Sequence, residues 1–157
     1  MSKNFIGLDK NNLGKVVEGL NKYLADLNVL YVKLHNLHWN IEGPAFFQLH
    51  SVFEQYYDKV TADLDEVAER ILTLGERPAA SVKEYIQLAS IEELNSKGIS
   101  ADASIEEVKK DFNHMLEQSR SILELAEEAK DQGTVDLMAG FIGYYEKTLW
   151  MINAYKA

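Results

Sequence analysis

One histidine and three carboxylates lie at helical spacings in the middle of the chain. His50 and Glu54 are four residues apart, and so are Asp65 and Glu69. Side chains at this spacing share one face of an α-helix. Imidazole and carboxylate ligands together suit iron, zinc or manganese, and the carboxylate oxygens favour the harder ions. The pattern therefore predicts a metal site, and a charged, solvated helix face is the alternative interpretation.

These four residues are too far apart along one helix to bind a single ion. Glu54 and Asp65 point within about 20° of each other, but His50 and Glu69 lie about 28 Å apart along the axis. Two antiparallel copies related by a two-fold axis remove this difficulty. In such a pair, a residue of one helix faces the residue of the other for which the two residue numbers add up to a fixed value. The residue numbers of Glu54 and Asp65 add up to the same value as those of His50 and Glu69, so one contact brings both couples together. We predict two equivalent sites, each with ligands from both subunits.

Two further histidines differ in what their surroundings indicate. His38 could fold over the Gly-Pro turn at residues 43–44 and add another nitrogen to the site. His114 ends the Asp-Phe-Asn-His stretch at residues 111–114, the nearest match to the Glu-x-x-His motif that two-metal helix bundles use twice. Because this stretch occurs once, a solvated helix face is the favoured interpretation for it.

The elements that position these side chains are predicted to be helices. Apolar residues recur at three- and four-residue steps, which is the signature of one-faced helices. We predict long helices over residues 9–40, 46–74 and 104–130, a fourth that begins at about residue 134, and a short helix at residues 81–90. The fold class is therefore all-α, a four-helix bundle with a short extra helix in its one long crossover, and bundles with one such crossover include the ferritin-like folds.

Residues that commonly start or end helices mark these boundaries. Ser81 and Ser104 each open a capping-box pattern and are predicted to start the short helix and the third long helix. Gly75 is predicted to end the second long helix. We expect Gly133 to break the third long helix and Thr134 to cap the last one.

Composition limits the classes of protein that the chain can belong to. The 157 residues contain no cysteine, which removes disulfide frameworks, thiolate zinc sites and cysteine nucleophiles. The length predicts one domain, residues 1–157. No secretory signal and no run of about 20 apolar residues is found, so we expect a cytoplasmic protein without a membrane partner. A net charge of −9 repels duplex DNA and favours metal cations.

With these features the sequence resembles the Dps family (DNA-binding proteins from starved cells), the miniature members of the ferritin-like superfamily. The matching segments are Lys-Leu-His-Asn-Leu-His-Trp-Asn at residues 33–40, Gly43, Phe-Phe-Gln-Leu-His at residues 46–50 and Asp-Glu-Val-Ala-Glu-Arg at residues 65–70. These motifs are specific as a set. The order of the predicted helices matches as well, so the resemblance spans nearly the whole chain.

The resemblance implies a twelve-subunit hollow shell, built from two-fold dimers, that protects against oxidative stress. Such a shell is a ferroxidase: it binds Fe(II), oxidises it with hydrogen peroxide as the preferred oxidant, and stores ferric oxide. Carried over by position, His38, His50 and Glu54 come from one subunit, and Asp65 and Glu69 come from its partner. Many relatives have Asp at the position of Glu54. Zinc competes well for such ligands and could occupy them in the purified protein.

The resemblance also implies roles for residues near these ligands. Trp39 is similar to the family's tryptophan beside the iron centre, which could donate an electron, and a wedge in the dimer core is the alternative. Asp131 and Asp136 flank the turn into the last helix, where acidic residues of similar proteins line the pores that admit iron. For Asp136, stabilisation of a helix N-terminus is the alternative. His35, one turn before His38, is expected to be structural or to support the ligands.

Two other functions stay open. The family name suggests DNA compaction, and members that bind DNA often carry a lysine-rich tail. The first twelve residues here contain two lysines, Lys3 and Lys10, and twelve copies would carry a charge of −108 (12 × −9), so we do not expect DNA binding. The second alternative is a non-catalytic shell that displays a surface to a partner. Changing His50 or Asp65 would then leave the function intact.

Overall fold

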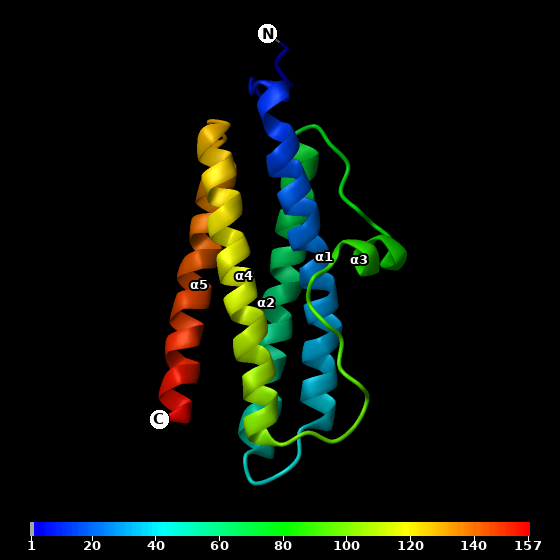
Figure 1. The fold of residues 1–157 in the computed structure, drawn as a ribbon, viewed down its shortest axis with the longest axis vertical. Helices are drawn as coiled ribbons and strands as arrows, with labels where there is room; N and C mark the ends of the chain where they lie inside the picture. Colours follow the sequence, from blue (N-terminus) through cyan, green and yellow to red (C-terminus); the bar gives the residue numbers. More distant parts are fainter. Residues whose placement is uncertain (1) are drawn as a thin grey trace.

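The computed structural model describes residues 2–157, which fold into four long helices and one short helix (Figure 1). The helices are α1 (Lys10–Asn40), α2 (Phe46–Thr73), α3 (Val82–Leu88), α4 (Ala101–Glu128) and α5 (Gln132–Lys156). After α2 the long connection carries the chain back along the bundle, so α4 starts at the end where α1 finishes. The prediction of an all-α bundle with a short helix in its crossover is confirmed.

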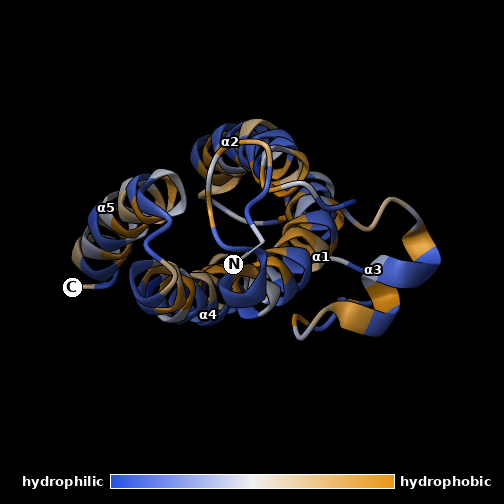
Figure 2. Cartoon of the chain, turned by 90° about the horizontal axis from the view of Figure 1, so that it is seen from above, coloured by the Kyte–Doolittle hydropathy of each residue, from blue (hydrophilic) through white to orange (hydrophobic). Residues whose placement is uncertain are grey.

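Large aromatic side chains from all four long helices meet in the core. Tyr23 of α1, Phe53 of α2, Phe112 of α4 and Tyr145 of α5 are among the largest fully buried side chains. Burying one such side chain contributes about 1.5–3 kcal/mol. Seen along the bundle, the four helices surround this core and α3 lies apart, beside α1 (Figure 2). No helix within residues 2–157 has an apolar stretch long enough to cross a bilayer.

The third long helix begins earlier than the capping box at Ser104 predicted. Ser100 is the N-cap, and its hydroxyl accepts a hydrogen bond from the amide of Ala103. Ser104 is fully buried inside the helix, and its hydroxyl donates to the carbonyl of Ala101. The chain just before Ser100 is held extended because Ile99 pairs with Ile41. This long-range pairing, which a local capping pattern does not include, sets the start of α4.

In the turn between α4 and α5, the residues that end one helix and cap the next also differ from the predicted ones. The helix breaks at Lys130, which has a φ of +58°, whereas the sequence predicted the break at Gly133. Asp131 is the N-cap of α5, and its side chain accepts from the amide of Thr134. Gly133 and Thr134 therefore lie in the first turn of α5, and the two predictions for them were wrong.

The end of α2 agrees with the sequence. Gly75 has a φ of +95°, a conformation that glycine adopts without steric cost. The amide of Gly75 bonds the carbonyl of Leu72, and the amide of Glu76 bonds that of Ile71. These two bonds form the Schellman motif that closes many helices. Ser81 caps α3 as predicted, accepting from the amide of Glu84.

One buried carboxylate fixes the crossover to the bundle. Asp26 of α1 accepts hydrogen bonds from the amides of Ser90 and Ile91, directly after α3, at 2.7 and 2.9 Å. Its second oxygen lies 2.7 Å from Nε2 of His114 on α4. His114 thus has a structural partner. Asp111, in the same stretch, is buried rather than solvated as predicted.

We expect the His114 pair to stabilise the fold more at low pH than at high pH. The hydrogen bond to Asp26 raises the pKa of His114 above its ordinary value of 6.5, with smaller effects in the same direction from Asp111 and Glu117. A raised folded-state pKa gives a contribution that is complete below the unfolded pKa and is lost as the pH rises through the folded one. His114→Gln should therefore lower the urea midpoint more at about pH 5 than at about pH 9. Equal losses at both values would contradict this expectation.

Candidate metal centre

Two of the predicted ligands meet where α1 ends and α2 begins. The imidazole rings of His38 and His50 stack with their centroids 3.7 Å apart. Nδ1 of His38 lies 2.6 Å from the carbonyl oxygen of His50, and Nδ1 of His50 lies 2.7 Å from that of His38. Because a carbonyl oxygen only accepts, each Nδ1 carries the proton and donates. In the neutral rings both Nε2 lone pairs are then free to bind a metal.

The turn between the two helices makes this reciprocal contact possible. Gly43 has a φ of +114°, which favours glycine and lets the chain reverse within a few residues. The first turn of α2 therefore lies beside the last turn of α1. Phe46 stacks on the ring of His50 with centroids 5.0 Å apart. The His50 ring is held between Phe46 and His38, so its orientation is set before any metal arrives.

Glu54 lies one turn after His50, and a tyrosine holds its exposed carboxylate. The hydroxyl of Tyr57 donates to Oε1 of Glu54 at 3.3 Å. Burial, followed by the charge of Glu54, raises the pKa of Tyr57, so the phenol stays protonated and can donate. The sequence interpretation missed Tyr57. Its position seven residues after His50, on the same helix face, is the signal that could have found it.

His35 and Trp39 continue the aromatic groups along α1. Nδ1 of His35 lies 2.8 Å from the carbonyl oxygen of Tyr31, and its ring stacks on Tyr57 with centroids 3.8 Å apart. These contacts favour the supporting role predicted for His35. Trp39 is 69% exposed and meets the edge of this group, with its centroid 5.3 Å from that of His35. Trp39 is therefore not a core residue of the single chain.

The other two predicted ligands lie far from this end of the bundle. Asp65 and Glu69 are exposed on α2, and Asp65 is about 22 Å along the helix from His50. In the described part of the chain, no group of three or more histidine, cysteine or acidic side chains could hold a metal ion. One chain therefore brings His38 and His50 together, with Glu54 on the next turn, and leaves the remaining carboxylates separate.

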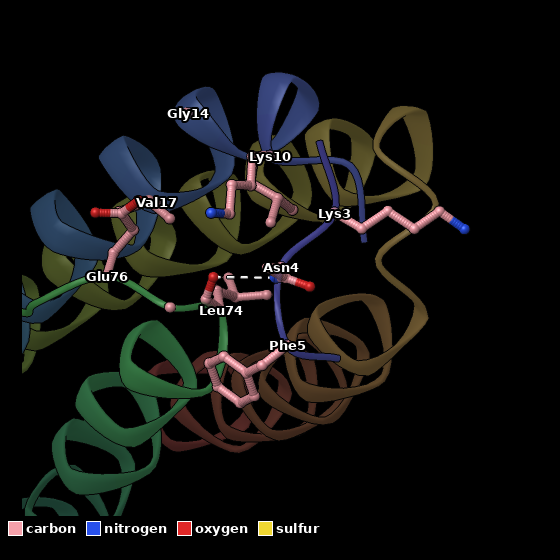
Figure 3. A pocket seen from close by; sticks show the side chains of 10 residues that line it. Lys3, Asn4, Phe5, Lys10, Gly14, Val17, Leu74 and Glu76 are labelled. Atoms are coloured by element: carbon pink, nitrogen blue, oxygen red, sulfur yellow. Dashed lines mark hydrogen bonds between the residues drawn. The ribbon is translucent and has the colours of Figure 1, made fainter. Parts of the chain in front are cut away.

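A cavity of about 580 Å³ lies at the opposite end of the bundle, between the N-terminal residues, the start of α1 and the end of α2 (Figure 3). Lys3, Lys10 and Glu76 line it together with apolar side chains. The side-chain amide of Asn4 closes one wall by donating to the carbonyl of Leu74 at 3.1 Å. The predicted ligands are not among its lining residues. The candidate chemistry therefore belongs to the helix surface near His50 and not to this cavity.

The two acidic residues near the α4–α5 turn occupy different environments. Asp131 is fully buried, and its Oδ1 lies 2.5 Å from Nη2 of Arg70. The hydroxyl of Thr134 donates to its second oxygen. The carboxylate of Asp131 thus faces the protein interior, unlike the solvent-facing position expected of a pore residue. Asp136 is exposed, and pore lining stays a prediction for this residue.

A side chain at Gly133, in the first turn of α5, would collide with the guanidinium group of Arg70. A Cβ atom at Gly133 would lie 2.6 Å from both terminal nitrogens of Arg70. Gly-to-Ala in a helix usually stabilises, but Gly133→Ala should push Arg70 from Asp131 and destabilise the protein by about 1–3 kcal/mol. Gly140→Ala, on the same helix with open space around its Cβ, is the matched control. Equal urea midpoints for the two variants would contradict this account.

Comparisons with known proteins agree with this fold. The ferritin-like domain family matches residues 17–156. The chain is 42% identical to DNA protection during starvation protein 2 of Bacillus anthracis, over 90% of this chain and 96% of that protein. It is also similar in structure to a Dps protein from Vibrio cholerae O1, described as a member of the ferritin-like diiron-carboxylate proteins, with a TM-score of 0.95 and 41% identity over 100% of this chain and 98% of that one.

A solved structure of Dps from Listeria innocua soaked with zinc is similar too. Its TM-score is 0.86, with 33% identity over 89% of this chain and 94% of that one. Antigen TpF1 of Treponema pallidum is 37% identical over 93% of this chain and 82% of that protein. Solved structures of proteins with these different names are therefore similar in fold to this chain.

Proposed function

This chain belongs to the Dps family of ferritin-like proteins, and from this premise we propose that it is an iron-storage ferroxidase whose metal centres are shared between subunits. The observation that carries the proposal is the reciprocal hydrogen bonding of His38 and His50. It leaves one ring nitrogen of each imidazole without a hydrogen-bond partner where α1 ends and α2 begins, at a half-buried His50 and a buried His38. Such fixed, correctly protonated imidazoles are typical of metal ligands.

The shared centre follows from the separation of the ligands. Because Asp65 and Glu69 lie far along α2 from His50, a second copy of the chain is needed to complete the ligand set. An antiparallel α2 from that copy would bring both carboxylates to the histidines, twice per dimer. Exposed apolar side chains on α1, on α3 and at the start of α2 support contact with a second copy; they are Tyr31, Val32, Trp39, Phe47, Val82 and Ile86.

The proposed reaction uses hydrogen peroxide as the oxidant. Two Fe(II) ions each give up one electron, and the peroxide takes both electrons and two protons to form two water molecules. The O–O bond therefore breaks without releasing a hydroxyl radical. Glu54, Asp65 and Glu69 stabilise the ferric product because carboxylates are hard anionic ligands. Zinc suits the same imidazole and carboxylate groups and competes with iron for them.

The remaining features of the proposal concern the assembly. We propose that residues 1–157 form one ferritin-like domain, that twelve copies form a cytoplasmic shell, and that ferric oxide collects inside it. Fe(II) would enter along acidic surfaces that include Asp136. Such carboxylates replace part of the hydration that a cation loses in a narrow pore.

DNA protection is the second candidate function, because several relatives carry that name. We propose that protection here comes from removing Fe(II) and peroxide rather than from coating DNA. Twelve chains of net charge −9 carry −108 (12 × −9), which opposes contact with phosphates. A gel-shift assay of the assembled protein with duplex DNA, at low salt and neutral pH, should show no retarded band. A retarded band would favour direct DNA binding.

The ferroxidase proposal is tested by loading the assembled protein with Fe(II) without oxygen and then adding peroxide. We expect the ferric absorbance to rise much faster than in protein-free buffer, and a spin trap to detect less hydroxyl radical. Preloading with Zn(II) should slow the reaction, because zinc occupies the same ligands. A rate equal to that of buffer would contradict the proposal and favour the non-catalytic, partner-binding alternative.

A further inference from the structure

Glu54 differs from the two histidines in how its orientation is fixed. The rings of His38 and His50 are held by backbone carbonyls and by stacking on each other. The side chain of Glu54 is exposed, and a free glutamate of this kind loses rotamer entropy when it is ordered. A group that orders this carboxylate in advance would therefore strengthen metal binding.

Tyr57 makes the contact that can order the Glu54 carboxylate. Its hydroxyl lies 3.3 Å from Oε1 of Glu54, on the same face of α2 and one turn further on. A hydrogen bond to a charged acceptor is stronger than one between neutral groups. The acceptor oxygen is one of two on the carboxylate, so the other stays available to an ion.

The ring of Tyr57 is itself held by α1. It stacks on His35, with centroids 3.8 Å apart and planes 21° apart, and it meets His38 edge-on with centroids 5.3 Å apart. Tyr31 adds an edge contact at 6.4 Å. Because the ring is attached to α2 and packs against side chains of α1, its hydroxyl is a donor in a defined position. The same ring also contacts the side of the His38 imidazole.

We propose that Tyr57 is a positioning residue of the metal centre: it holds the Glu54 carboxylate toward the site through its hydroxyl and braces the His38 ring through the edge-on contact of the two rings. This inference rests on the proposed function, because it assigns Tyr57 a role at that same centre. Tyr57 acts through Glu54 and His38 and does not itself bind the ion. The structure also gives His35 a part, as the surface on which the Tyr57 ring stacks.

Tyr57→Phe separates the hydrogen bond to Glu54 from the ring contact with His38, because it removes the hydroxyl and keeps the ring. The assembled shell would be titrated without oxygen with Co(II), whose visible spectrum reports ligand binding. We expect Tyr57→Phe to weaken Co(II) binding about three- to ten-fold, the effect of one ordinary hydrogen bond, because the contact is long at 3.3 Å and lies at an exposed position. Tyr56→Phe is the matched control: that ring packs on Phe53 and Phe112, and its affinity should equal that of the wild type.

A double-mutant cycle shows whether the hydroxyl acts through Glu54. In a Glu54→Ala background Tyr57→Phe should cause no further loss, because the acceptor is gone. An unchanged Co(II) affinity in Tyr57→Phe, or an equal loss with and without Glu54, would overturn the inference. If the wild-type shell and Tyr57→Phe bind Co(II) equally well, the role of Tyr57 is refuted and the proposed metal centre is not. A wild-type shell that binds neither Co(II) nor Fe(II) refutes the proposed function as well.

Discussion

Asp65→Ala is expected to lower the initial rate of Fe(II) oxidation by peroxide about 100-fold or more, while the shell stays assembled. Even residues that only support a metal ligand cost about 10–100-fold when removed, and Asp65 is proposed to bind the ion directly. Its side chain is exposed and takes part in no ion pair within the described chain, so its loss should leave the fold intact. Stopped-flow absorbance after anaerobic Fe(II) loading measures the rate, and size-exclusion chromatography checks the assembly.

Glu66→Ala is the matched control for this variant. Glu66 is the next residue on α2, is also exposed and carries the same charge, but it lies about 100° around the helix from Asp65. We expect Glu66→Ala to oxidise Fe(II) at the wild-type rate. If both variants lost activity equally, the effect would come from surface charge and not from a specific ligand.

Lys33→Ala is expected to produce the largest loss of stability, about 3–5 kcal/mol. Lys33 is 2% exposed, and its Nζ lies 2.8 Å from Asp111 and 2.9 Å from Glu107 on α4. Asp111 is 3% exposed. Removing the lysine therefore leaves a buried carboxylate without its cation. Urea unfolding at fixed protein concentration measures the change.

The pH dependence and a double variant test the cause of this loss. Burial raises the pKa of Asp111, so lowering the pH through that raised value protonates the carboxyl and removes the charge that lacks a partner. The deficit of Lys33→Ala should therefore shrink at low pH. Lys33→Met combined with Asp111→Leu should be close to wild type, because an apolar pair replaces the ion pair. A double variant as unstable as Lys33→Ala would contradict this explanation.

The parts of the fold that the sequence predicted correctly depend on local patterns. The apolar periodicity predicted the four long helices, the capping box at Ser81 predicted the short one, and Gly75 was correctly expected to end α2. The predicted start of α4 at Ser104 was wrong. The chain pairs at Ile99 with Ile41, and the helix begins directly after this pairing, with Ser100 as its N-cap. Residues so far apart in sequence give no local signal of their contact.

The same distinction applies to the candidate site. The Gly-Pro turn predicted that His38 could approach His50, and the structure brings these rings together. Tyr57 lies on the same face of α2 as His50 and Glu54, so its contact with Glu54 could have been predicted from the sequence spacing. The Arg70–Asp131 pair joins residues 61 positions apart, so the sequence could not show that this carboxylate is buried. The contribution of the partner subunit is inferred from the spacing of the ligands along α2 and from the resemblance to the Dps family.

Subunit complementation is the most direct test of shared centres. His50→Ala and Asp65→Ala chains would be co-expressed so that they mix at random in one shell. If the site is shared, half of the two-fold pairs are mixed, and one of the two centres in each mixed pair keeps all its ligands, so about one quarter of the wild-type ferroxidase activity returns. If each chain holds a complete site of its own, no mixture restores one. Activity no higher than that of the two parent variants would contradict the account.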